Sequence, residues 1–362
     1  MKKCIYSKEE FEQADGEHIL QDSFGARWKS NDISSNSVQE EFGEGIDCTV
    51  ASQFQEIRTI LGFKGGRKGD SPDIKNIKGS DGNQYHLKSG GIPHIASPIV
   101  QEYQDNEGND ITKISVSEYR QINFTGKKIK DKFPDSTFTK EELRSKATKE
   151  SSNVDAEFQV DIELGGKDFF RGILKSIFNL LGVKNSNLAL TPEFDGLREF
   201  ILSGSGDVTS YVRWITCSTT LPIPILGEFD HFICVFSNNQ KVDGFVQFYG
   251  EIAYSIRLAE TYQGDDFCYS YLVNPCRNTV PPEKKDCQFD KSILPHFDSG
   301  VKTLTKNVED IYRMRLSNIL RKNENRQKIQ KITDEILCAE DVKTIDDDSL
   351  NLLIDKISDH YR

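Results

Sequence analysis

The sequence predicts an α+β protein. It has a small N-terminal hairpin-and-helix unit, a mixed antiparallel sheet-and-helix core and a C-terminal helical extension. Apolar residues recur every three to four positions after residue 42, which is typical of a helix, and alternate after residue 246, which is typical of a strand. Beyond residue 301 the chain is densely charged and helical in pattern. With 362 residues and 36% hydrophobic content, it is long enough for two or three domains.

We divide the chain by composition and pattern into four regions. These are residues 1–68, a hairpin-and-helix unit; 69–165, a connecting region rich in loops and short strands; 166–300, an α+β core; and 301–362, a charged helical region.

In the first region, residues 4–6 and 31–33 are expected as short strands, with the pair Glu17-His18 between them. A helix is expected over residues 42–61 and should end at Gly62. Its apolar positions are Phe42, Ile46, Val50, Phe54, Ile57, Ile60 and Leu61.

Basic residues lie just before the connecting region and within it. Five basic residues are candidate phosphate contacts: Lys64, Arg67, Lys68, Lys127 and Lys128. Basic runs of this kind are equally often solvated surface, so both interpretations stand.

In the core, an amphipathic helix is expected over residues 169–181, closed by Gly182. Strands are expected at 210–218 and 229–236, followed by one half-buried strand over 246–258 with a bulge at Gly250. The helices after residue 301 carry an apolar seam of Leu304, Val308, Ile311, Met314, Leu316 and Leu320. This seam packs either on its own domain or on a protein partner.

Charge and composition narrow the class of protein. The formal net charge is −11, and this argues against strong stand-alone binding to nucleic acid, which depends on neutralising phosphates. We expect no signal peptide, no membrane span and a cytoplasmic location. The eight cysteines include no CxxC pair, so reduced thiols are expected; Cys268, Cys276, Cys287 and His296 match no zinc spacing known to us.

The first 68 residues resemble the HNH endonuclease family. The matching residues are Cys4, Glu17-His18-Ile19-Leu20, Phe24-Gly25, Phe42-Gly43 and Ile46-Asp47. A looser similarity extends over the helix at 170–181 and the segment 231–258. The resemblance implies a ββα-metal unit at the N-terminus.

The resemblance also implies a metal-dependent hydrolysis of nucleic acid. His18 would be the general base that deprotonates water, and Glu17 would help to hold one divalent cation, Mg²⁺ or Mn²⁺. Asn31 falls where the family's middle asparagine can lie and would steady the histidine loop. The substrate would be DNA or, less often, RNA.

Several positions depart from the family pattern. Ser7, Ser35 and Val38 stand where three of four zinc cysteines are expected, so a structural zinc is not expected. Alignment without gaps places Gln39 at the metal-binding asparagine, whereas a second register uses Asn36.

Two functions remain open. One is a metal-dependent endonuclease, with defence against phage as a role by analogy. The other is a catalytically degenerate HNH-like subunit that binds or assembles with a protein partner.

Overall fold

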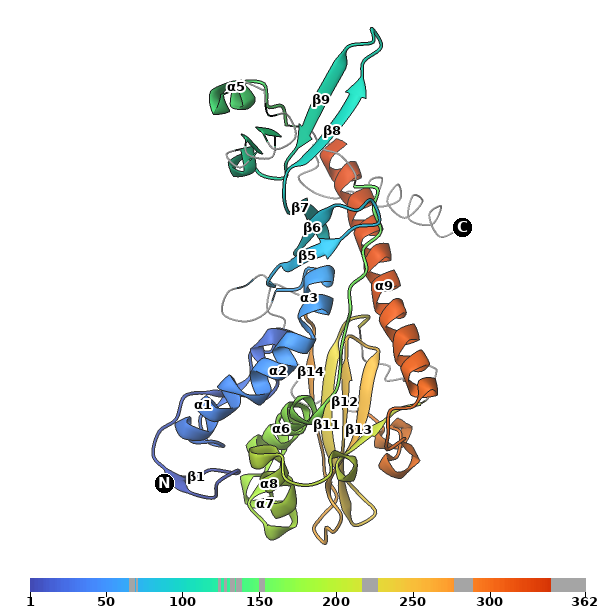
Figure 1. Ribbon diagram of the computed structural model, residues 1–362. Coiled ribbons are helices and arrows are strands. Elements are labelled where there is room, and N and C mark those ends of the chain that lie inside the picture. The colour runs from blue at the N-terminus through green and yellow to red at the C-terminus, as the bar shows by residue number, and fades with distance from the viewer. Residues whose placement is uncertain are drawn as a thin grey trace. The chain divides into compact units, whose positions relative to one another are not determined.

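The computed structural model (Figure 1) describes residues 1–64, 69, 71–122, 125–126, 129–130, 134, 139–149, 154–216, 227–276 and 289–339. The chain divides into two compact units, one formed by Met1–Ile46 with Phe170–Arg362 and the other by Asp47–Phe169. The boundary that the sequence places at residue 68 stays a prediction. The predicted α+β class, with antiparallel sheets and a C-terminal helix, is confirmed.

A five-stranded antiparallel sheet forms the centre of the first unit, in the order β10-β13-β12-β11-β14. Its strands are β10 (Val212–Trp214), β11 (His231–Asn238), β12 (Lys241–Phe248), β13 (Ile252–Ala259) and β14 (Cys268–Val273). The five strands are buried along most of their length, because both faces of the sheet are covered.

The single strand expected over residues 246–258 is wrong. The segment is the end of β12 and all of β13, joined by a turn at Tyr249 and Gly250, whose φ angles are 53° and 66°. Three residues separate Phe248 from its partner Ile252, so the apolar alternation continues in phase through the turn. A Cβ on Gly250 would lie 2.8 Å from the carbonyl oxygen of Glu228.

Helix α6 (Lys167–Lys184) packs on one face of this sheet (Figure 1). The Phe170 ring meets the Tyr254 ring edge-on at 5.3 Å, and a Cβ on Gly244 would lie 3.0 Å from Ile177. Gly182, expected to end the helix, lies inside it. A Cβ there would stand 2.6 Å from Ile5 Cδ1, so this glycine allows close packing. Helices α7 (Ser186–Ala189) and α8 (Asp195–Ser203) follow.

Residues 289–300 cover the other face, where Leu294 joins Phe232, Cys234 and Phe245 in a buried apolar cluster. The start of α9 (Lys306–Ala339) packs elsewhere: its Tyr312 ring lies 5.0 Å from Trp214 and 5.8 Å from Tyr254, two side chains that also contact Phe170 of α6. Along α9 the buried positions are Val308, Tyr312, Arg315, Ile319 and Asn323, whereas the predicted seam residues Leu304 and Met314 are exposed. The predicted seam was misplaced because the packed side of the helix also carries polar residues. The Tyr312 hydroxyl, for example, donates to the Ala253 carbonyl.

The N-terminal segment begins with two short hairpins. β1 (Lys2–Lys3) pairs with β2 (Glu10–Phe11), and β3 (Glu17–His18) pairs with β4 (Lys29–Ser30). The strands expected at 4–6 and 31–33 are instead a turn and a bend just after β1 and β4. The expected single helix is three: α1 (Asn36–Glu44), α2 (Ile46–Gln53) and α3 (Gln55–Leu61), and it starts six residues earlier than predicted.

The second unit contains α2 and α3 with two small antiparallel sheets. β5 (Ile74–Lys78), β6 (Gln84–Lys88) and β7 (Ile92–Ile95) form one, and β8 (Ile99–Gln104) pairs with β9 (Asp110–Ser115) in a separate ribbon. Helix α5 (Lys140–Ser145) begins with a capping box between Thr139 and Glu142. Within the residues described, no helix is both long and apolar enough to cross a bilayer.

Candidate functional site

The β3–β4 hairpin positions the Glu17-His18 pair. Glu17 lies opposite Ser30 and His18 opposite Lys29, and the Ile19 amide donates to the Trp28 carbonyl at 3.0 Å. At the hairpin's turn, Phe24 is buried and its ring stacks on Phe248 at 4.7 Å. The hairpin is therefore fixed to the large sheet through its turn.

Glu17 is tied to helix α6 by a buried ion pair. Its Oε1 lies 2.6 Å from Lys175 Nζ, and the two side chains are only 7% and 3% exposed. Asn179, one helical turn after Lys175, donates from Nδ2 to Glu17 Oε1 at 3.3 Å and to the His18 carbonyl at 2.9 Å. Spacing of four residues places Lys175 and Asn179 on one face of α6, which faces β3.

Two aromatic rings complete this network. The Tyr6 hydroxyl donates to Asn179 Oδ1 at 2.5 Å, which fixes the orientation of the amide. The Lys175 ammonium lies 5.1 Å from the centre of the Phe42 ring on α1, a cation–π distance. Removing one partner of a buried ion pair typically costs about 3–5 kcal/mol, so the contact contributes to holding β3, α1 and α6 together.

The His18 imidazole is half-buried beside this ion pair. Burial, with a smaller contribution from the positive charge of Lys29, lowers the pKa of His18 to about 4. Its Nδ1 atom is buried and makes no hydrogen bond to any residue that the structure describes. The ring is therefore neutral at pH 7, but it is a weak base, and no acceptor in the described part of the chain orients its Nδ1.

Two of the three amide residues predicted to complete the site hold backbone instead. Asn36 Oδ1 accepts from the Asp15 amide at 2.7 Å, and Gln39 Nε2 donates to the Asp15 carbonyl at 2.8 Å. Asn31 is exposed, and its carbonyl accepts from Lys2. In the described part of the chain, no hydrogen bond joins Asn31, Asn36 or Gln39 to the side chain of Glu17 or His18.

The remaining predictions for the site concern metal ligands and phosphate contacts. Among the described residues, no three His, Cys, Asp or Glu side chains are grouped so that they could hold a metal ion. Of the basic residues considered as phosphate contacts, Lys64 is exposed, whereas Arg67, Lys68, Lys127 and Lys128 lie outside the described residues.

Sequence reasoning found Glu17 and His18 but missed their partners Lys175, Asn179 and Tyr6. A signal for two of them was present. Lys175 and Asn179 lie four residues apart in the apolar-rich stretch of α6 from Ile173 to Leu181, and the structure shows them to be 2% and 0% exposed. A polar residue on a buried helix face requires a partner, which is a reason to search for one.

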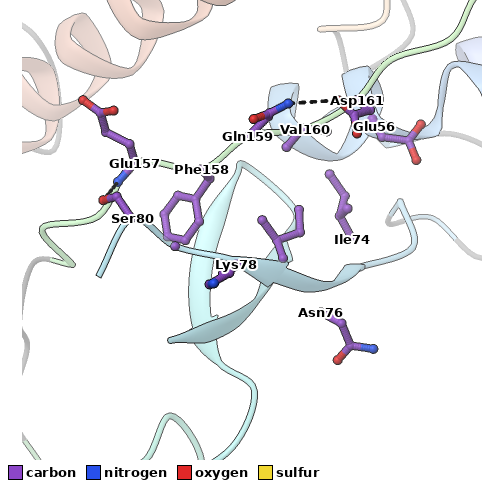
Figure 2. Close-up of a pocket in the computed structure, with 12 residues that line it drawn as sticks. Glu56, Ile74, Asn76, Lys78, Ser80, Glu157, Phe158, Gln159, Val160 and Asp161 are labelled. Atoms are coloured by element: carbon purple, nitrogen blue, oxygen red, sulfur yellow. Dashed lines mark hydrogen bonds between the residues drawn. The ribbon is translucent and has the colours of Figure 1, made fainter. Parts of the chain in front are cut away.

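The second unit has a hollow of its own, shown in Figure 2. It lies between β5 and residues 157–161, which are held together by the hydrogen bond from the Ser80 amide to the Glu157 carbonyl at 3.0 Å. Its charged lining residues are Glu56, Lys78, Glu157 and Asp161. The lining contains neither histidine nor cysteine, so it offers no thiol and no imidazole base.

Comparison with known proteins gives no relative. No family model matches the chain, and neither a curated protein nor a solved structure is significantly similar to it. The chemistry of the Glu17-His18 corner is therefore the basis on which we infer a function.

Proposed function

We propose that β3, β4 and α1 form an HNH-type ββα module whose catalytic corner now has a structural role. The protein would then act as a non-catalytic binding or assembly component. The observation that carries this proposal is the buried ion pair between Glu17 and Lys175. The carboxylate that the resemblance assigns to a metal already has a cation beside it.

The order of elements supports the HNH-type origin. A hairpin with histidine at the end of its first strand is followed directly by a helix, and Gln39 and Phe42 lie on that helix. The use of Asn36 and Gln39 to hold the backbone of Asp15 supports the loss of metal binding. Ordinary packing, including the edge-on contact of Tyr6 with Phe42, stabilises the small unit without the missing cysteines.

A metal-dependent endonuclease is the second candidate, and one observation favours it. Burial keeps His18 neutral at pH 7, which is the form that a general base needs. Against it stands the Lys175 ammonium: a divalent ion about 4 Å away would be repelled by roughly 8 kcal/mol at an effective dielectric constant near 20. Cleavage would therefore require Lys175 to leave the corner.

The deciding experiment is a cleavage assay. Purified wild-type protein and His18→Ala are incubated with supercoiled plasmid DNA, and in parallel with RNA, in Mg²⁺ or Mn²⁺. We expect neither protein to cut above a buffer control that contains the metal. Metal-dependent cutting by the wild type that His18→Ala abolishes would establish the nuclease and refute the non-catalytic role.

A plaque assay extends the test to the role in phage defence that the resemblance suggests. For a non-catalytic component of a defence system, cells that express wild type or His18→Ala should be protected equally, relative to an empty vector. Protection by the wild type alone would favour catalysis. Equal plating on all three strains would remove the defence role.

A further inference from the structure

We propose that the hollow between β5 and residues 157–161 is a docking site for a protein partner, which adds a β-strand there with alternating basic and apolar side chains. This inference rests on the proposed function and deepens it, because a non-catalytic binding component needs a surface that holds its partner. All residues that line the hollow belong to the second unit.

Residues 154–164 have the side-chain pattern of a β-strand, although they form none of the strands of this structure. Half-buried and exposed side chains alternate along them without interruption. The half-buried positions are all apolar, and every exposed position except Gln159 carries a carboxylate. A period of two with one apolar face is typical of a strand that pairs with neighbours in a half-covered sheet.

Pairing of this segment with β5 begins but does not continue. An isolated antiparallel bridge forms at Phe158, and the Ser80 amide donates to the Glu157 carbonyl at 3.0 Å. In the part of the chain that the structure describes, the backbone of residues 160–164 makes no hydrogen bond. Peptide groups of an extended chain point alternately to its two edges, so those of Asp161 lie on the same edge as those of Glu157 and face the hollow.

A bulge in β5 explains why the pairing stops. The register of β5 with β6 shifts between Ile74 and Ile77, and Asn76 has a φ angle of 60°. Such a bulge bends a strand and disrupts regular pairing along it. The far end of the segment is held by Gln53, whose side-chain amide bonds both the N–H and the carbonyl of Gly165. The stretch between these attachments is therefore extended and has an open edge.

The hollow along this edge has the size and charge that suit a basic peptide (Figure 2). Its volume is about 680 Å³, within the range of roughly 300–1,000 Å³ that is common for ligand pockets. Three carboxylates and one ammonium line it, from Glu56, Glu157, Asp161 and Lys78. None of these four charged groups forms an ion pair with another residue that the structure describes. The surplus of negative charge favours lysine or arginine on the partner.

Strand addition accounts for the open edge and for the alternation together. An extended peptide that joins an open edge gains main-chain hydrogen bonds, and its alternate side chains give specificity. On the added strand, every second side chain lies beside the carboxylates of Glu157 and Asp161. The remaining side chains lie on the apolar face, with Phe158 and Val160. The partner's strand therefore alternates basic and apolar residues.

The test measures binding of a short fluorescent peptide of alternating lysine and valine to the full chain by fluorescence anisotropy. We expect saturable binding, and roughly tenfold weaker binding of a peptide in which the same lysines precede the same valines. Hydrogen exchange should slow at the amides of residues 159–163 in the complex, but not in the β8–β9 ribbon. Equal affinity for the two peptides, or binding of neither, would overturn the inference.

Variants of the chain locate the contact. Glu157→Gln/Asp161→Asn removes two carboxylates and should weaken binding of the alternating peptide roughly fivefold at low salt. Glu107→Gln/Asp110→Asn makes the same charge change at exposed positions of the β8–β9 ribbon and should leave the affinity unchanged. Asp161→Pro lacks a backbone N–H and should bind more weakly than Asp161→Asn, which keeps it. Thermal midpoints show whether each variant is folded.

Three results with these variants would contradict the inference. Equal binding by folded Asp161→Pro and Asp161→Asn would mean that no strand is added at this edge. Equal weakening by the two double variants would mean that the peptide responds to overall charge and not to the hollow. A wild-type dimer that Asp161→Pro dissociates would assign the hollow to a second copy of this chain. Plasmid cleavage tests the proposed function and peptide binding tests this inference, so either can fail alone.

Discussion

At the scale of single residues, the burial of His18 has a consequence for stability. Its pKa is about 4 in the folded protein, compared with about 6.5 for an ordinary histidine. Between these two values the unfolded chain binds a proton that the folded chain does not. The contribution of His18 is therefore fully present above pH 6.5 and is lost as the pH falls toward 4.

We expect this dependence to disappear in His18→Gln, which does not titrate. The free energy of unfolding, measured with urea between pH 7.5 and 4.5, should fall more steeply for the wild type than for the variant over that interval. The difference between the two proteins isolates His18, because all other carboxylates and histidines are shared. Parallel curves would contradict the lowered pKa of His18.

Single residues also show which parts of the site could be predicted from the sequence and which could not. Glu17 and His18 could be found because both belong to one short motif, and the missing zinc cysteines could be read directly. Asn179 could not be assigned to Glu17, since the two residues are 162 positions apart and meet only when α6 docks on β3. Similarly, the hydrogen bonds of Asn36 and Gln39 to Asp15 depend on how the loop before β3 folds.

At the scale of elements, Gly182 lets α6 approach the N-terminal turn. A Cβ at this position would lie 2.6 Å from Ile5 Cδ1 and 3.5 Å from Ile33 Cγ2. Gly182→Ala improves helix propensity by about 1 kcal/mol, but overpacking in a close contact typically costs about 1–3 kcal/mol. The steric cost should dominate or cancel the gain, because Ile5 is fully buried and has little room to move.

We expect Gly182→Ala to be no more stable than the wild type in urea unfolding, and Ile5→Val to recover stability when combined with it. Ile5→Val alone should cost about 0.5–1.5 kcal/mol, so recovery in the double variant would show coupling between the two sites. A clear gain in stability from Gly182→Ala alone would mean that the contact with Ile5 is absent.

Gly182 also shows why element boundaries were harder to predict than element types. The amphipathic pattern of α6 was clear, but a glycine near its end suggests a stop and here serves packing. Likewise, alternation identified β12 and β13 as strand but could not reveal the turn between them, because Tyr249, Gly250 and Glu251 keep the pattern in phase. For Gly182 the deciding contact, with Ile5, comes from a segment distant in the chain.

At the scale of the whole molecule, the first unit brings the N-terminal hairpin against the central sheet. Phe24, in the turn of the N-terminal hairpin, packs against the rings of His231 on β11 and Phe248 on β12, which also contact each other. Glu17 meets α6, which packs on the same face of that sheet. The hairpin and the sheet should therefore unfold as one cooperative body, although most of the chain separates them in sequence.

Phe24→Ala tests this cooperativity. Phe24 is 2% exposed, so its truncation should cost about 3–5 kcal/mol. If the hairpin and sheet unfold together, hydrogen exchange should accelerate by a similar factor at the Ile19 amide of the hairpin and at amides of β11 and β12. Tyr103→Ala, at a side chain 49% exposed on β8, is the matched control and should leave both regions unchanged. Faster exchange in the hairpin alone would show that it is a separate, weakly attached element, and the Glu17–Lys175 contact would then have to form and break independently of the core.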